Sequence, residues 1–176
     1  MRQDMLKQLT PSHCIVLMPV WQGHDIKVLV LSGGITNKLY RVDVTDVGQF
    51  VVRVYGEKTE LFINRHHEMQ NIKQLASSGV TAKLVSYLPE HHVTIVAYVP
   101  GTTACNADFK CAIKLPQLVN SIQSLHRSGA VLPKIFNPLE QVQTLYALYQ
   151  KMGIVHHDFD IPKIMTPSHI VNQINK

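Results

Sequence analysis

The sequence predicts an α+β fold: a five-stranded antiparallel sheet with one inserted helix, followed by a helical region. Five short runs of alternating or continuous apolar residues, the pattern of half-buried strands, lie before Gly101. Between the third and the fourth run lies a longer stretch with apolar residues at helical spacing. Beyond Gly101 only helical periodicity remains, so the fold class changes near that residue.

The elements follow in a simple order. Residues 1–9 form a short amphipathic helix that we expect to end at Thr10-Pro11. Residues 60–77 form the inserted helix, which Ser78-Gly79 ends. After the Val99-Pro100-Gly101 break, the periodicity predicts helices over residues 113–126, 138–151 and 167–175. The strands are predicted over residues 25–31, 38–44, 49–55, 83–87 and 92–98.

Composition and charge argue against a nucleic-acid-binding, metal-binding or membrane-spanning protein. Of the 176 residues, 17 are Lys or Arg and 12 are Asp or Glu, which gives a net charge of +5. The basic residues are scattered along the chain, so we expect no nucleic-acid partner. The three cysteines lack the spacing of metal ligands, so we expect no metal site and a reducing, cytoplasmic location. No apolar run is long enough to span a membrane. Three His-His pairs do not change this, because adjacent residues point in different directions.

A loop of small residues joins the first two strands. It comprises Ser32, Gly33, Gly34, Ile35, Thr36 and Asn37. Glycines expose backbone N–H groups and permit close approach of a ligand, which is what phosphate binding requires. The loop matches neither the G-x-x-x-x-G-K-[S/T] motif nor the G-x-G-x-x-G motif. A plain hairpin turn would therefore also explain the glycines.

Two charged residues stand at positions where a charge needs a partner. Arg53 lies in the middle of the third strand, between two valines. Glu68 lies on the apolar stripe of the following helix and should therefore face the sheet. Its partner is either Arg65, three residues earlier on the helix, or Arg53 on the strand.

Along the chain come a loop of small residues, a basic residue on a strand, an acidic residue on the next helix and a Pro-Gly break. This order resembles that found in the nucleotide lobe of a kinase-like phosphotransferase. The chain resembles the superfamily of choline/ethanolamine kinases and aminoglycoside phosphotransferases, the choline kinase branch above all. The resemblance covers about residues 20–150. It rests on the segments 31–42, 51–56, 64–71, 78–84, 98–101, 124–126 and 136–139.

The resemblance implies a nucleotide-binding lobe over residues 1–100 and the helical start of a second lobe over residues 101–176. It implies that the loop from Ser32 to Asn37 covers the phosphates of ATP, with Arg53 at the phosphate-binding strand position and Glu68 as its partner. The backbone of Ala97 and Val99 would meet the adenine edge. A complete enzyme would use Mg²⁺ and transfer the γ-phosphate of ATP to the hydroxyl of choline or a similar alcohol.

The sequence departs from this family in the helical lobe. The family motif His-x-Asp-x-x-x-x-Asn has a partial match at His156-x-Asp158, but Lys163 stands where the motif requires Asn. We therefore expect no catalytic residue and no phosphoryl transfer by this chain alone. The alternative is a non-catalytic kinase-like module that binds nucleotide or a protein partner. We also expect self-association through the face that the rest of a second lobe would cover.

Overall fold

The computed structural model describes residues 1–32, 34, 36–61, 63–76, 79, 81–133 and 137–153. The chain divides into two compact units, residues 1–133 and 134–176. The predicted helix over residues 167–175 and the segment His156–Asp160 lie outside the described residues. The division of the chain into lobes near Gly101 remains a prediction.

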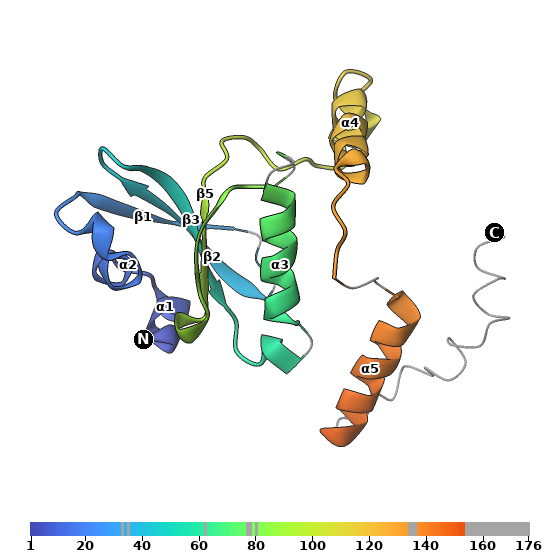
Figure 1. Cartoon of the computed structure of the whole chain (residues 1–176), viewed down its shortest axis with the longest axis horizontal. Coiled ribbons are helices and arrows are strands. Elements are labelled where there is room, and N and C mark those ends of the chain that lie inside the picture. Colours follow the sequence, from blue (N-terminus) through green and yellow to red (C-terminus); the bar gives the residue numbers. More distant parts are fainter. Residues whose placement is uncertain are drawn as a thin grey trace, which may run out of the picture. The chain divides into compact units, whose positions relative to one another are not determined.

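A five-stranded antiparallel sheet forms the centre of the first unit, as the sequence predicts (Figure 1). Its strands lie in the order β1-β2-β3-β5-β4, and the crossover from β3 to β4 contains helix α3 (Arg65–Ala76). The three-stranded meander at its start and the β4–β5 hairpin therefore meet where β3 pairs with β5. The strands are β1 (Ile26–Leu31), β2 (Asn37–Val44), β3 (Gly48–Tyr55), β4 (Leu84–Leu88) and β5 (Val93–Ala97).

Alternation along the strands assigns their two faces. In β2, Tyr40, Val42 and Val44 are buried, whereas the residues between them are partly exposed. Their neighbours across the ladder, Val52 on β3 and Ile95 on β5, are buried on the same face. The opposite face carries Leu39, Arg53 and Thr94 side by side, because strand residues one position away point the other way.

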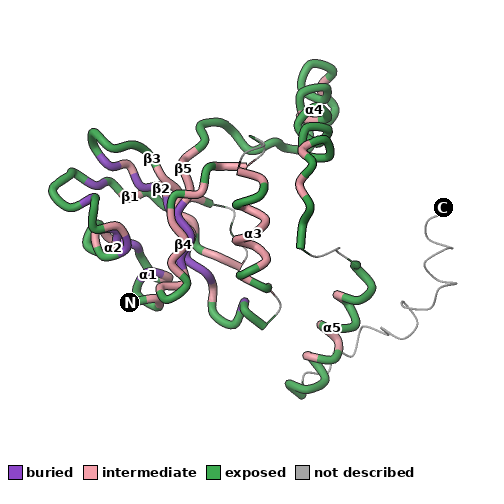
Figure 2. The backbone as a smooth tube through the Cα atoms, viewed as in Figure 1, coloured by how far each residue is buried: buried purple, intermediate pink, exposed green. Residues whose placement is uncertain are grey.

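Two short N-terminal helices cover the apolar face, and α3 lies on the other side of the sheet (Figure 1). These are α1 (Arg2–Lys7) and α2 (Pro11–Leu17), followed by a 3₁₀ turn, η1 (Pro19–Trp21). Together with the strands they build the core of the described residues, coloured purple in Figure 2. Its members are Met5, Leu9, Cys14, Leu17, Trp21, Ile26, Tyr40, Val42, Val44, Val52, Val54, Val93 and Ile95.

Helix α2 differs from the expectation that Thr10-Pro11 only ends a helix. Thr10 is the N-cap of α2: its hydroxyl accepts from the His13 amide at 3.3 Å, and the His13 ring accepts from the Thr10 amide at 3.3 Å. Pro11 occupies the first helical position, where its missing N–H costs nothing. The same two residues therefore end one helix and begin the next.

The inserted helix starts later than the predicted residue 60. Residues Thr59–Leu61 form a separate 3₁₀ turn, η2, and α3 begins at Arg65. The Asn64 side chain accepts from the His67 amide at 3.1 Å and so satisfies one of the first-turn donors. At the other end Gly79 adopts φ +69°, the left-handed conformation typical of a residue just beyond a helix.

The helices after Gly101 lie close to the predicted ranges. The first is α4 (Lys114–Arg127), preceded by a 3₁₀ turn, η4 (Asp108–Lys110), and the second is α5 (Pro138–Lys151). Asn137 caps α5 by accepting from the amides of Leu139 and Glu140. Neither helix contains a buried residue (Figure 2). None of the described helices is long and apolar enough to cross a membrane.

Candidate functional site

Arg53 and Glu68 form an ion pair on the sheet face opposite the core. Arg53 Nη1 lies 2.8 Å from Glu68 Oε1, and the two side chains are 32% and 20% exposed. Strand alternation sends Arg53 toward α3, and Glu68, in the first turn of α3, faces the strand. The prediction that these two residues pair is confirmed.

Glu68 also pairs with Arg65, so the two partners that the sequence left as alternatives are both present. Arg65 Nη1 lies 2.7 Å from the second carboxylate oxygen, Glu68 Oε2. One carboxylate thus bridges a strand guanidinium and a helix guanidinium, and the three side chains together carry a net charge of +1. An anion is the ligand that such a site attracts.

Asn37 links this ion-pair cluster to the small-residue loop. In the orientation that satisfies both ends of its side-chain amide, the oxygen accepts from Arg53 Nε at 3.2 Å and from Nη2 at 2.9 Å. The amide nitrogen then donates to the Thr36 carbonyl at 3.1 Å. The end of the loop and the strand cation are therefore held together before any ligand is present.

Two glycines, Gly34 in the loop and Gly56 after β3, lie too close to neighbouring backbone for a larger residue to fit without movement. A Cβ on Gly34 would lie 2.1 Å from the Asn37 carbonyl oxygen, and one on Gly56 would lie 2.3 Å from the Thr36 carbonyl oxygen. Gly56 donates its amide to that same Thr36 oxygen at 3.0 Å. Ser32 and Gly34 are exposed, and Thr36 is half-buried. Gly33 and Ile35, also predicted site residues, lie outside the described residues.

Tyr55, Thr59 and Thr94, which the sequence did not single out, surround the ion-pair cluster. The Arg65 guanidinium carbon lies 3.9 Å from the centroid of the Tyr55 ring, and Arg65 Nη2 donates to Thr59 Oγ1 at 2.5 Å. The Tyr55 hydroxyl is hydrogen-bonded to the Thr94 hydroxyl. Burial raises the pKa of the Tyr55 phenol, so it stays protonated near neutral pH. Alternation on β3 could have identified Tyr55, which shares a face with Arg53.

The strand end near Gly101 is separate in sequence from these residues. The Ala97 amide donates to the Lys83 carbonyl at 2.8 Å, and the Tyr98 amide donates to the Gln49 carbonyl at 2.9 Å. Val99, just beyond the strand, is 64% exposed. The Ala97 amide is therefore already bonded, and any ligand there would meet its carbonyl or the Val99 backbone.

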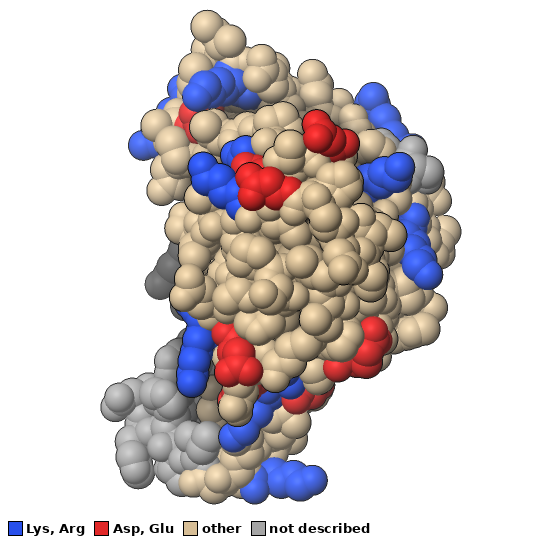
Figure 3. Space-filling view, turned by 90° about the vertical axis from the view of Figure 1, so that its left-hand side faces the viewer, with Lys and Arg blue, Asp and Glu red and all other residues tan. Residues whose placement is uncertain are grey.

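One face of the molecule shows how the charged side chains are distributed (Figure 3). On this face Lys and Arg side chains are spread over the surface, and some of them lie next to Asp or Glu side chains. Among the described residues, no group of three His, Cys, Asp or Glu side chains could hold a metal ion. The cluster of Arg53, Glu68, Arg65 and Asn37 is therefore the candidate site that the geometry favours.

Sequence relatives agree on one family. The model of choline/ethanolamine kinases matches residues 28–173. Ethanolamine kinase 2 of Mus musculus is 32% identical over 127 residues, which is 67% of this chain and 31% of that protein. Ethanolamine kinase 2 of Rattus norvegicus is 37% identical over 127 residues, with the same coverage of 67% and 31%. The chain thus spans about a third of the length of these relatives.

Solved structures have the same fold. The choline kinase LicA from Streptococcus pneumoniae superposes with a TM-score of 0.69 at 19% identity, over 93% of this chain and 56% of LicA. A structure of LicA in complex with AMP gives a TM-score of 0.58 at 24% identity, over 80% of this chain and 50% of that one. Fold and family model agree, and the chain belongs to the choline/ethanolamine kinase family.

Proposed function

We propose that this chain is the adenine-nucleotide-binding portion of a choline/ethanolamine-kinase-like phosphotransferase. The single observation that carries the proposal is the ion pair of Arg53 and Glu68, with Asn37 joining it to the small-residue loop. A guanidinium held in place on a strand, next to a loop in which Ser32 and Gly34 are exposed, offers paired donors to phosphate oxygens. AMP in the LicA complex supports an adenine nucleotide as the ligand.

The proposed nucleotide would extend from the loop to the strand end after β5. Its phosphates would meet Arg53 and the backbone of the loop, which comprises Ser32, Gly33, Gly34, Ile35, Thr36 and Asn37. Its adenine edge would meet the Ala97 carbonyl and the backbone of Val99. Arg41 lies on β2, one strand beyond β3, and its guanidinium carbon lies 4.5 Å from the ring centroid of Tyr98, which follows β5.

Phosphoryl transfer belongs to the complete fold of the family. Its reaction would pass the γ-phosphate of ATP to the hydroxyl of choline or ethanolamine. The 176-residue sequence contains no His-x-Asp-x-x-x-x-Asn motif, so we infer no transfer activity for this chain alone. The described residues offer no set of metal ligands, and no step of the proposal runs through Mg²⁺.

Isothermal titration calorimetry tests the proposal with the chain as it is. We expect ATP to bind, and we expect Arg53→Gln to weaken binding at least tenfold, since it removes a charged donor. Arg127→Gln, at the exposed end of α4, makes the same substitution away from the site and should leave the affinity unchanged. A chain that binds no ATP, or that binds it equally well without Arg53, would overturn the proposal.

Activity assays separate a phosphotransferase portion from a non-catalytic module. Purified chain should form no phosphocholine or phosphoethanolamine from ATP. Turnover by this chain would refute the inferred lack of transfer activity. Fusion of residues 1–153 to the remaining part of the fold from a homologous kinase should restore turnover if the lobe is a working one. An inactive fusion that still binds ATP would favour the module.

Self-association is also part of the proposal. One face of α4 carries apolar side chains at helical spacing, and Leu115, Val119, Ile122 and Leu125 are 37–53% exposed. We infer that two copies associate through this face, and sedimentation of wild type and Ile122→Glu tests it. A wild-type chain that is monomeric at high concentration would contradict it. The free cysteines fit a reducing, cytoplasmic location, which is also part of the proposal.

A further inference from the structure

Arg65 is the least exposed charged group of the candidate site. Its side chain is 13% exposed, compared with 20% for Glu68 and 32% for Arg53. A guanidinium remains charged at every accessible pH, so burial at this level requires partners on several sides. Arg65 has them from three different elements.

Each contact of Arg65 fixes a different part of its guanidinium. Nη1 is bonded to Glu68 Oε2 at 2.7 Å, and Nη2 donates to Thr59 Oγ1 at 2.5 Å. The plane of the group stacks on the Tyr55 ring at 3.9 Å. A guanidinium held at both terminal nitrogens and on one face has little rotational freedom.

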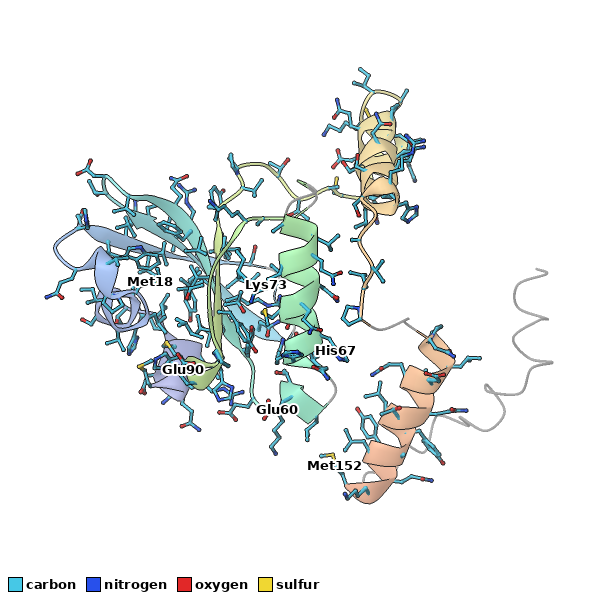
Figure 4. The ribbon with its side chains drawn as sticks, viewed as in Figure 1. Met18, Glu60, His67, Lys73, Glu90 and Met152 are labelled. Atoms are coloured by element: carbon cyan, nitrogen blue, oxygen red, sulfur yellow. The ribbon has the colours of Figure 1, made fainter. Side chains whose placement is uncertain are left out.

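The partners of Arg65 are themselves anchored to the sheet. Thr59 Oγ1 donates to the Gly56 carbonyl at 3.0 Å, just after the end of β3. The Tyr55 hydroxyl is bonded to Thr94 on β5. Arg2 of α1 donates to the same Gly56 carbonyl at 2.6 Å and lies 3.7 Å from Glu60 of η2 (Figure 4 marks Glu60 beside the start of α3). The position of Arg65 is therefore fixed by contacts at the end of the sheet as well as by its place on α3.

Glu68 transmits this fixed position to the strand cation. Its Oε2 is held by Arg65, and its Oε1 contacts Arg53 at 2.8 Å. A glutamate has three rotatable side-chain bonds, so a carboxylate with one free oxygen samples several positions. With one oxygen fixed, the other meets Arg53 in a single direction, and Asn37 holds the opposite side of that guanidinium.

We propose that Arg65 is a positioning residue: it orients Glu68, and through Glu68 it sets the direction in which Arg53 presents its donors to the nucleotide phosphates. The inference rests on the proposed nucleotide-binding function. Arg65 does not contact the nucleotide in this account. It acts by reducing the cost of organising Arg53 when the phosphates bind.

Ligands with and without phosphate separate positioning from a structural role. If Arg65 only stabilises the junction of η2 and α3, its loss should weaken ATP and adenosine binding alike. If it positions Arg53, its loss should weaken ATP binding and leave adenosine binding unchanged, because adenosine has no phosphate for Arg53 to meet. The two roles therefore predict different ratios of the two affinities.

The experiment is calorimetric titration of the full chain with ATP and with adenosine. We expect Arg65→Gln to raise the Kd for ATP about tenfold, the size expected from disturbing one charge-assisted hydrogen bond. The Kd for adenosine should stay within twofold. Arg65→Lys keeps the charge and loses the two-pronged geometry, so it should recover only part of the ATP affinity. It also serves as the test variant if Arg65→Gln does not fold.

A double substitution completes the test. In an Arg53→Gln background, Arg65→Gln should have no further effect on the Kd for ATP, since Arg65 acts through Arg53. Equal losses for ATP and adenosine, or independent and additive effects of the two substitutions, would overturn the inference while leaving nucleotide binding intact. A wild-type chain that binds no ATP would instead refute the proposed function, and this inference with it.

Discussion

Glu68 of α3 divides its carboxylate between two arginines: Oε1 lies 2.8 Å from Arg53 Nη1 on β3, and Oε2 lies 2.7 Å from Arg65 Nη1 on its own helix. One acidic side chain therefore joins the inserted helix to the sheet. All three groups are partly shielded from water, so removing one of them costs more than it would at an exposed ion pair. The predictions below begin with this carboxylate.

Glu68→Gln should destabilise the fold by about 1–2 kcal/mol, between the values typical of exposed and of buried ion pairs. The substitution keeps the shape of the side chain and leaves two half-buried arginines without their anion. Urea denaturation measures the change in the free energy of unfolding. Glu57→Gln is the matched control, because Glu57 is exposed and accepts a hydrogen bond from the Gln3 side chain at 3.2 Å. Equal stability losses in the two variants would contradict the prediction.

Gly34→Ala should impair ATP binding by displacing the loop. The added Cβ would lie 2.1 Å from the Asn37 carbonyl oxygen, and a backbone atom cannot move aside without shifting the loop that ends at Asn37. Overpacking of this kind costs on the order of 1–3 kcal/mol. ATP titration and thermal melting of the same sample give affinity and stability together.

Gly23→Ala is the control for this glycine. Gly23 adopts φ +88°, so alanine there is strained, but no atom lies within 4 Å of its added Cβ. It should lower the melting temperature and leave the ATP affinity unchanged. Retention of full ATP affinity by Gly34→Ala would show that the loop does not need its close packing.

Tyr40→Phe should cost about 1–2 kcal/mol, because it removes a buried hydrogen bond and leaves its acceptor unsatisfied. The Tyr40 hydroxyl donates to the Met5 carbonyl at 2.7 Å and so ties β2 to helix α1. Tyr149→Phe, at a residue that is 48% exposed on α5, should change the free energy of unfolding by less than about 0.5 kcal/mol. A Tyr40→Phe variant as stable as wild type would mean that this hydrogen bond contributes little to the stability of the fold.

Cys14 should react with thiol reagents only after unfolding. Burial raises the pKa of its thiol to about 12 from an ordinary value of 9.0, so at pH 8 the reactive thiolate is nearly absent in the folded chain. Because the folded pKa is the higher one, the thiol's contribution to stability is complete below pH 9 and is lost as the pH rises from there toward 12. Exposed Cys105 should react quickly in the same assay.

Labelling with a chromogenic disulfide at pH 8, with and without denaturant, counts the thiols. Cys14→Ser should abolish the slow thiol that appears only in denaturant, and Cys105→Ser should remove a fast one. Rapid modification of Cys14 in the native chain would contradict its place in the core.

The strand pattern allowed much of the site to be predicted. Alternation put Arg53 on the face opposite Val52 and Val54, and helical spacing turned Glu68 toward the sheet, so Arg53 was one of two partners that the sequence offered for Glu68. The sequence did not predict that Glu68 pairs with Arg65 and Arg53 at once. Residue spacing shows which side chains can be neighbours, but not that one carboxylate is divided between two of them. Thr59 and Tyr55 were not singled out, since their contacts depend on where η2 ends and α3 begins.

Helix α2 shows a different limit. Thr10-Pro11 is a valid end for one helix and an equally valid start for another, and local sequence does not separate the two. The burial of Cys14, Leu17 and Trp21 against the sheet decides it, and that contact lies between distant parts of the sequence. Thr-x-x-His as a reciprocal cap was the available signal.

The melting temperature of the wild-type chain with and without ATP, beside that of Arg53→Gln, tests the central claim most directly. At an ATP concentration 100 times its Kd, binding should add about 2.7 kcal/mol to the free energy of unfolding and raise the melting temperature of wild type. Arg53→Gln should show a much smaller rise at the same ATP concentration. No rise in wild type at millimolar ATP, or an equal rise in both proteins, would contradict nucleotide binding at the site that Arg53 and Glu68 form.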